Sequence, residues 1–162
     1  MGLFSRKKEQ IDPNTIYSPF VGKVMPIEKL KDKTFAGKVM GDGIAVVPTE
    51  GKIYAPISGT ISALLDTKHA YGITSPEGYE LLVHIGQDTV NLKGQHFETK
   101  VKEGSKIKKG DLLGTFDIAA ITGKGYNIAT PVIVIAGGEF SIKSKAKNGN
   151  INVGDVLLTV GK

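Results

Sequence analysis

Histidine is scarce in this chain, with three copies among 162 residues, yet one of them, His84, lies inside an apolar segment. Side chains of an extended segment alternate between two faces, which here groups Leu81, Val83 and Ile85 on one face and Glu80, Leu82 and His84 on the other. If the first face packs in a core, the His84 imidazole projects at the end of a strand, partly desolvated and titrating near neutral pH. An imidazole in that position is suited to act as a nitrogen nucleophile.

The residues around His84 offer ways to orient it. Gly86 lets the chain turn tightly, and a backbone carbonyl at this turn can accept a hydrogen bond from one ring nitrogen, which leaves the other nitrogen free. His69 lies at the edge of another strand-like segment, fifteen positions earlier, and Thr67 offers a hydroxyl to orient it. A nearby His69 can stabilise charge that develops on phosphoryl oxygens. We therefore interpret the two histidines as a phosphoryl-transfer pair.

Two other interpretations of these histidines stay open on the residues alone. A histidine in a strand is often only a packed structural residue, and paired histidines are also zinc ligands. The sequence has neither an HExxH motif nor a close His-x-His pair, so a third ligand would have to be acidic, and we expect no permanent metal site. The third histidine, His96, lies in a polar loop and is expected to be exposed.

The elements that must position these residues are short strands. Runs rich in Val, Ile and Thr predict strands at 52–54, 60–65, 80–85, 112–116, 130–135 and 156–160. Turn residues separate them, including Gly41-Asp42-Gly43 and Pro76-Glu77-Gly78. The segment 117–121 is the one helical turn expected. The pattern predicts an all-β protein, an antiparallel β-sandwich or barrel with at most short helical turns.

Two pairs of segments resemble each other within the chain. Residues 17–24 (YSPFVGKV) are similar to residues 54–61 (YAPISGTI), and residues 104–113 are similar to residues 149–158 with one residue dropped. In each, glycine permits a sharp turn and the aliphatic residues resume a buried strand. Two copies are too few for a solenoid, so we expect a compact sandwich with internally duplicated hairpins.

Composition sets the remaining bounds. Residues 1–14 are expected to form a flexible tail, and residues 15–162 a single domain with a sizeable core. The tail begins MGLFSRKKEQ, which favours at most weak contact with a membrane surface, and Arg6 stands where a myristoylation motif needs Ser or Thr. The Met1 start suggests a free-standing protein. No segment is apolar over the length of a bilayer, and zero cysteines exclude disulfides and fit a cytoplasmic protein.

The net charge of +5 comes from scattered lysines. They lack the interleaved aromatic residues of a single-strand binder and accompany no helix-turn-helix or zinc-finger pattern, so we expect no nucleic-acid partner. Solvated surface faces are the simplest interpretation of these lysines, and attraction to an acidic protein partner is the better functional alternative.

Five stretches occur in a familiar order along the chain. They are FAGKVMGDGIA at 35–45, YAPISGT at 54–60, TKHAY at 67–71, ELLVHIGQDTVNLKG at 80–94 and TPV at 130–132. Together they resemble the glucose-type enzyme IIA of the phosphoenolpyruvate-dependent sugar phosphotransferase system. The resemblance covers nearly the whole chain after the tail.

The resemblance implies an antiparallel β-sandwich with a shallow depression. His84 would accept a phosphoryl group on Nε2 with His69 in support, Thr67 would be the hydroxyl neighbour of His69, and the Gly86 carbonyl would orient His84. Asp88 would lie beside the site. An apolar rim, which expels water from the phosphohistidine as a partner docks, would consist of Phe35, Val39, Leu65, Leu82 and Val90.

The implied partners are other proteins of the system. The histidine-containing phosphocarrier protein would donate to His84, and the IIB domain of a sugar permease would receive the group, usually on a cysteine. Regulatory proteins are further expected partners. No cofactor is required, and zinc would be held between His69 and His84 only in a partner complex. The sequence does not indicate which sugar is transported.

A biotinyl or lipoyl carrier domain is the alternative interpretation, since 55–60 and 104–113 resemble its hairpins. That carrier needs a lysine at an exposed turn, and the corresponding segment 116–121 has none. A cell-wall zinc peptidase of similar topology would need a His-x-His motif and a further His/Asp pair, which are also absent.

Overall fold

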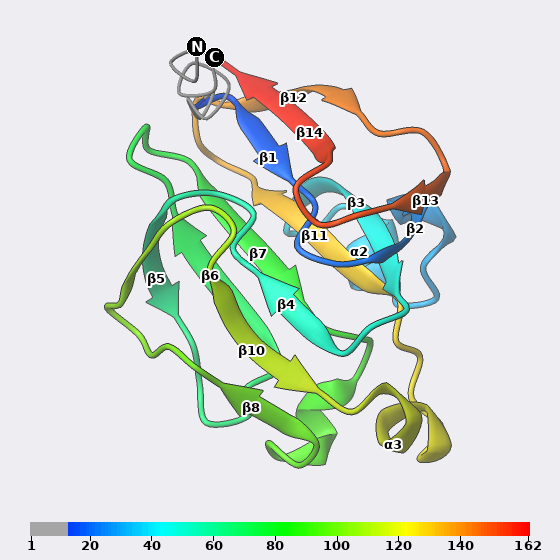
Figure 1. The fold of residues 1–162 in the computed structure, drawn as a ribbon. Helices are drawn as coiled ribbons and strands as arrows, with labels where there is room; N and C mark the ends of the chain where they lie inside the picture. The colour runs from blue at the N-terminus through cyan, green and yellow to red at the C-terminus, as the bar shows by residue number, and fades with distance from the viewer. Residues whose placement is uncertain (1–12) are drawn as a thin grey trace, which may run out of the picture.

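Antiparallel pairing joins all the strands in the structure, a computed structural model that describes residues 13–162. In chain order the strands are β1 Thr15–Tyr17, β2 Gly22–Pro26, β3 Gly41–Pro48, β4 Lys52–Tyr54, β5 Gly59–Ala63, β6 Ala70–Thr74, β7 Glu80–His84, β8 Phe97–Thr99, β9 Lys106–Ile107, β10 Leu112–Phe116, β11 Thr130–Ile135, β12 Ser141–Lys145, β13 Gly149–Ile151 and β14 Val156–Gly161. An eight-stranded sheet has the order β13-β2-β3-β11-β7-β6-β5-β9, and two three-stranded sheets have the orders β1-β14-β12 and β4-β10-β8 (Figure 1). The predicted all-β sandwich is confirmed.

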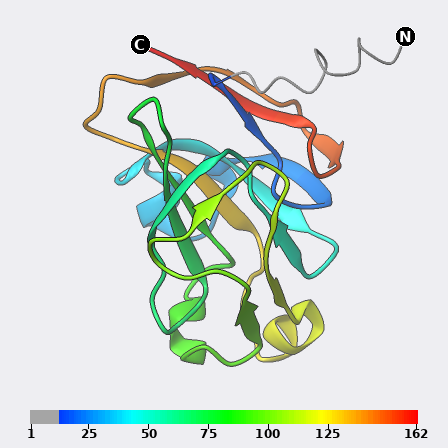
Figure 2. The ribbon, with the colours of Figure 1, turned by 60° about the vertical axis from the view of Figure 1, so that its left-hand side comes forward.

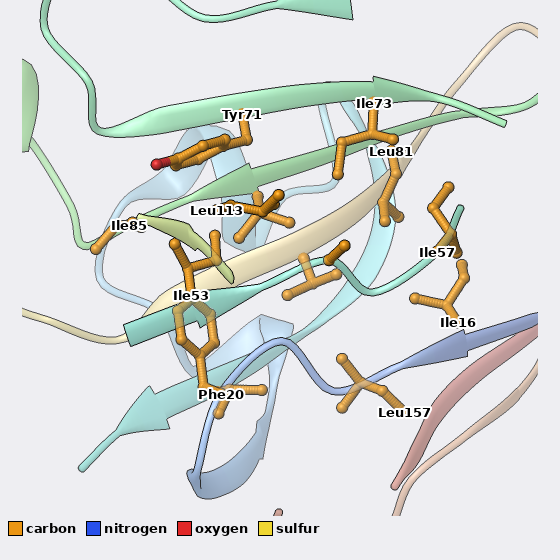
Figure 3. Packing of buried hydrophobic residues seen from close by; sticks show 14 of the residues in the cluster. Ile16, Phe20, Ile53, Ile57, Tyr71, Ile73, Leu81, Ile85, Leu113 and Leu157 are labelled. Carbon is orange, nitrogen blue, oxygen red and sulfur yellow. The ribbon is translucent and has the colours of Figure 1, made fainter. Parts of the chain in front are cut away.

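The main core lies between the large sheet and the two small ones. Figure 3 shows side chains from β6 and β7, such as Tyr71 and Leu81, meeting Ile53 and Leu113 from the facing layer. All four are buried. Val83 and Ile85 belong to the same cluster, so the predicted core face of the segment around His84 is confirmed.

A smaller apolar cluster covers the opposite face of the large sheet. Its buried members are Ile27, Leu30, Phe35, Ala45, Ala129 and Ile133, with Leu82 packed against them. Alternation along β11 explains the division, because Val132 and Val134 join the main core while Ile133 faces the smaller cluster. Leu82 and His84 share this second face.

Short helical segments cover this second face and one end of the sandwich. They are η1 Ile27–Lys29, α2 Lys33–Ala36, η2 Thr89–Leu92 and α3 Ile118–Gly123. Asp117 caps α3 by accepting a 3.0 Å hydrogen bond from the Ala120 N–H, which agrees with the helical turn expected there. The other three were not predicted, since segments of three or four residues carry no periodicity to detect. Figures 1 and 2 both show η2 and α3 at one end of the molecule.

The prediction of a turn at Gly41-Asp42-Gly43 was wrong, since these residues begin β3. A Cβ added to Gly41 would collide with the carbonyl oxygen of Val134, and one added to Gly43 with that of Val132. The glycines allow β3 to approach β11 closely, a use of glycine that resembles turn chemistry in the sequence.

The internal duplication corresponds to a matched set of backbone contacts. The N–H of Tyr17 donates to the Pro56 carbonyl over 3.0 Å, and the N–H of Tyr54 donates to the Pro19 carbonyl over 2.9 Å. The second pair of repeats is attached in the same way, each by a 2.8 Å bond: Ser18 N–H to the Asp155 carbonyl, and Ala55 N–H to the Asp111 carbonyl. Asn14, which the sequence placed in the tail, accepts a hydrogen bond from the Val160 N–H. The rest of the predicted tail, through residue 12, lies outside the described residues.

Candidate functional site

Strand pairing brings the two predicted histidines together. His84 ends β7 and stands opposite Ala70, the first residue of β6. The N–H of Ile85 donates to the carbonyl of His69 over 2.7 Å, which continues the ladder one residue further. The ring centroids of His69 and His84 are 4.6 Å apart with the planes at 82°. The two imidazoles therefore form one site, as expected from the sequence.

The turn after His84 fixes its tautomer. His84 Nδ1 lies 2.7 Å from the carbonyl oxygen of Gly86. Because a carbonyl only accepts, the ring proton must be on Nδ1, and Nε2 is left with a free electron pair. The sequence anticipated a carbonyl of this turn in that role, and the structure places the Gly86 carbonyl there.

Gly86 has a conformation that suits glycine. Its φ is +76°, and an added Cβ would lie 2.7 Å from the Thr89 methyl carbon and 3.0 Å from the Asn127 carbonyl oxygen. Its N–H donates to the hydroxyl of Thr130, which in turn donates to the Ile128 carbonyl. Thr130 is fully buried, so the glycine whose carbonyl contacts the His84 ring is itself bonded to the sheet.

Burial keeps both imidazoles neutral. The pKa of His69 is lowered to about 4, chiefly by desolvation and then by the neighbouring His84. Desolvation also lowers the pKa of His84, against the opposing effects of the Gly86 carbonyl and, more weakly, the carboxylates of Asp32 and Asp88. A neutral His84 is the nucleophilic form of the ring at neutral pH.

The predicted rim residues fall into two groups. Val39, Leu65 and Val90 are exposed, at 72%, 70% and 46%. Val39 follows α2, which carries Phe35, and Leu65 lies in the loop before His69. Val90 lies in η2, two residues after Asp88. Phe35 differs, because it is 4% exposed and its ring centroid is 4.9 Å from that of His84. It packs against the imidazole from within the smaller cluster, together with half-buried Leu82, and is not presented as a rim.

Thr67 and Asp88 occupy the loops that flank the histidines. Neither Thr67 Oγ1 nor His69 Nδ1, both buried, has a hydrogen-bond partner within residues 13–162. The expected hydroxyl support of His69 is therefore not made in this structure. Asp88 is exposed and begins η2 with a φ of +61°, a left-handed conformation in a residue other than glycine.

Several residues of the site were not singled out from the sequence. The Gln87 side chain accepts a 2.8 Å hydrogen bond from the Asp32 N–H, and its backbone N–H donates to the Asn127 carbonyl over 2.9 Å. Asp32 and Gln87 are 55 positions apart, so no local signal joins them. Thr130 stood inside one of the familiar stretches but was given no role.

His96 is part of a different region. It is half-buried, and its Nε2 is buried without a partner among the residues that the structure describes. It lines a cavity of about 690 Å³ with Phe97, Phe116 and Asp117. The expectation that His96 is simply exposed was wrong, because the side chain is half-buried at a cavity beside β8 and β10.

Within residues 13–162, no three side chains of the kind that bind metals are grouped as they would be in a metal site. No helix in the same range is long and apolar enough to cross a membrane.

The structure is thus an antiparallel β-sandwich in which two imidazoles lie side by side. The sequence profile of the family described as the phosphoenolpyruvate-dependent sugar phosphotransferase system, EIIA 1, matches residues 14–140, and the chain belongs to this family. The matched segment ends just before β12.

Relatives and a solved structure agree with this assignment. The chain is 44% identical over 143 residues to a beta-glucoside-specific EIIBCA component of Halalkalibacterium halodurans and 41% identical over 145 residues to one of Bacillus subtilis. These alignments cover 88% and 90% of this chain but only 22% and 24% of the relatives. The glucose permease IIA of Mycoplasma capricolum has a TM-score of 0.84 at 33% identity, covering 90% of this chain and 94% of that one.

Proposed function

We propose that this protein is a phosphocarrier of a sugar phosphotransferase system, which accepts a phosphoryl group on Nε2 of His84 and passes it to the IIB domain of a sugar permease. The observation that carries the proposal is the 2.7 Å contact between His84 Nδ1 and the Gly86 carbonyl, because it leaves Nε2 unprotonated beside a second imidazole. Membership of the EIIA family supports the reaction class.

The donor is the phosphohistidine of the histidine-containing phosphocarrier protein. His84 Nε2 attacks phosphorus, a new N–P bond forms, and the donor imidazole leaves with the electron pair of the old N–P bond. Positive charge that develops on the His84 ring is stabilised by the Gly86 carbonyl at Nδ1. In the second step a cysteine thiolate of the IIB domain attacks phosphorus, an S–P bond forms, and Nε2 recovers its electron pair.

His69 supports both steps. A neutral imidazole keeps one N–H, and donation of that N–H to a phosphoryl oxygen stabilises the charge spread over the transferring group. The buried hydroxyl of Thr67 is close in sequence and lacks a partner within residues 13–162, so we assign it to orient His69 once the phosphoryl group is present. Exposed Val39, Leu65 and Val90 then contact the partner and exclude water, with Asp88 beside them.

We assign no cofactor to this reaction, because the phosphoryl group moves between nucleophiles of similar energy and positioning supplies much of the rate. Zinc would bind only where a partner adds ligands to His69 and His84.

We place the protein in the cytoplasm, which suits a chain without cysteine. The relatives' names make beta-glucoside permeases the first acceptors to test. The comparisons give no support to the biotinyl or lipoyl alternative.

The direct experiment uses labelled phosphoenolpyruvate with the first enzyme of the system and its small phosphocarrier protein. We expect acid-labile, alkali-stable label on the chain, its loss in His84→Ala, and label in His69→Gln that is not passed on to a IIB domain. His96→Gln is the matched control, since it removes a histidine outside the site, and it should accept and donate normally. Label that persists in His84→Ala would refute the assignment.

A further inference from the structure

We infer that Gln87 is a positioning residue of the site: its side-chain amide ties the start of α2 to the loop after His84 and so holds the Phe35 ring against the imidazole. The contacts stand by themselves, whereas their consequence for phosphoryl transfer rests on the proposed function.

Gln87 joins three segments that are far apart in the chain. Its side chain accepts a 2.8 Å hydrogen bond from the Asp32 N–H, and its own N–H donates to the Asn127 carbonyl over 2.9 Å. Because a backbone N–H only donates, the amide oxygen must face Asp32 and the NH₂ group must point away from it. Gln87 is 4% exposed, and its bond to half-buried Asp32 is partly shielded from water.

The segment that receives this bond needs external support. A helix of four residues is not stable alone. The entropy lost in forming its first turn exceeds the stabilisation from the few hydrogen bonds of that turn. Asp32 starts α2 by accepting a 2.9 Å hydrogen bond from Thr34 on its side chain and bonds from Phe35 and Ala36 on its carbonyl. The position of α2 therefore follows the position of Asp32, and the amide of Gln87 fixes Asp32.

The far end of α2 is attached more weakly. Lys38 follows α2 and pairs with Glu28 over 2.8 Å and with Asp42 over 3.5 Å. All three side chains are more than a third exposed, and exposed ion pairs contribute little to stability. The partly buried hydrogen bond to Gln87 is thus a stronger polar constraint on α2 than these ion pairs.

What α2 carries is the Phe35 ring. It lies 4.9 Å from the His84 ring at 55° and is almost fully buried. A ring held there keeps water from one side of the imidazole, which protects a phosphohistidine from hydrolysis. If the Asp32 bond is lost, α2 loosens and this protection weakens.

The NH₂ group of Gln87 offers a competing role. Its Nε2 is buried without a partner among residues 13–162, and Gln87 lines a cavity of about 450 Å³ with Asp32, Asp88, Asn91 and Tyr126. A donor at such a cavity could serve a partner protein instead of positioning α2. Two substitutions separate the roles, since Gln87→Met removes both the acceptor and the donor, whereas Gln87→Glu keeps an acceptor oxygen for Asp32 and loses the donor.

The experiment combines two measurements on the unphosphorylated protein with one on the phosphorylated protein. Amide hydrogen exchange at Asp32 reports the bond itself, and the NMR shifts of the His84 ring protons report the Phe35 ring current. Spontaneous loss of label from phosphohistidine reports water exclusion. Asn91→Ala is the matched control, because it changes a residue of the same cavity that makes no side-chain bridge between loops.

We expect the Asp32 amide of the unmodified protein to be protected. In Gln87→Met its exchange should accelerate about fivefold to tenfold, as for loss of one hydrogen bond, the His84 ring signals should shift, and label should be lost about fivefold faster. Gln87→Glu should retain the Asp32 protection and the His84 ring shifts, and Asn91→Ala should resemble the unmodified protein in all three.

Three results would overturn the inference. One is a freely exchanging Asp32 amide in the unmodified protein, and another is Gln87→Met with unchanged exchange and unchanged His84 signals. The third comes from one further measurement, the rate of labelling by the phosphocarrier protein. Slower labelling of both Gln87 variants without any change at Asp32 or His84 would assign the amide to partner contact. If the unmodified protein cannot be labelled at all, the proposed function fails, while exchange and ring shifts still decide whether Gln87 positions Phe35.

Discussion

The two faces of the large sheet use the same strands for different purposes. The inner face contributes Tyr71, Leu81 and Val83 to a continuous apolar core, all of them buried against a second layer of sheet. The outer face carries Leu82 and His84 under a small cluster that is covered by α2 and η1. One strand, β7, thus alternates between residues that stabilise the fold and residues that make the site. The comparison teaches that the site can be altered with little loss of stability, provided the inner face is left intact.

Substitution of two neighbouring leucines gives the strongest test of the difference between the two faces. Leu81→Ala removes a fully buried side chain from the main core and should lower the free energy of unfolding by about 4 kcal/mol. Leu82→Ala, which changes a half-buried residue of the outer cluster, should cost about 1.5 kcal/mol. Urea denaturation measures both. Equal costs for the two would mean that the faces do not differ as described.

Gly86→Ala tests the turn that follows β7. The added methyl group would meet Thr89 and the Asn127 carbonyl at a φ of +76°, so we expect a loss of about 3 kcal/mol. The Gly86 carbonyl would also move from His84 Nδ1, and labelling of the folded protein should slow about a hundredfold. Gly78→Ala is the matched control, because Gly78 also has a positive φ but nothing lies within 4 Å of its added methyl group. It should leave labelling unchanged.

The pair of histidines should also make stability depend on pH. The pKa of His69 is lowered to about 4 in the folded protein, so between its ordinary value of 6.5 and 4 only the unfolded chain takes up a proton there. The free energy of unfolding should therefore fall as pH decreases from 6.5 to 4, by about 2 kcal/mol after solvent screening, and this contribution should level off below pH 4. The lowered pKa of His84 acts in the same direction. Thermal denaturation of His69→Gln should show a flatter profile over that range, and an unchanged slope would contradict the buried neutral form.

The smallest effect on stability is expected at the rim. Val39→Ser changes a side chain that is mostly exposed and should alter the free energy of unfolding by less than about 0.5 kcal/mol. If Val39 contacts the partner, the KM for the phosphocarrier protein should rise several-fold while the maximal rate is kept. Val156→Ser is the matched control, since Val156 is exposed on β14, outside the loops that carry the histidines. A rise in KM for both variants would remove the distinction.

The sequence was most informative where the structural cause is local. Alternation from Glu80 to Ile85 predicted the core face correctly, and the Gly86 carbonyl lies only two residues from the ring that it orients. The sequence predicted a turn at Gly41 and Gly43 instead of a strand, because these glycines make room for β11, which lies about ninety positions away in the chain. The bond between Gln87 and Asp32 gave no signal for the same reason.

The burial of Phe35 also could not be predicted from the sequence. The resemblance named Phe35 as a rim residue, whereas its burial depends on a single helical turn too short to be predicted. The same resemblance named Val39 and Leu65, and both are exposed, as is usual for residues in connecting segments.

The pairing of β1 with β14 has a consequence for synthesis on the ribosome. Strand β1 can pair with β14 only after residues 156–159 have emerged from the ribosome. The hydrogen bond from the Ser18 N–H to the Asp155 carbonyl becomes possible at about the same point of synthesis. Closure of the domain must therefore wait for nearly the whole chain, as expected for contacts of high sequence separation. A nascent chain stopped before Val156 would leave β1 without its partner strand, so its backbone N–H and C=O groups could pair with another chain.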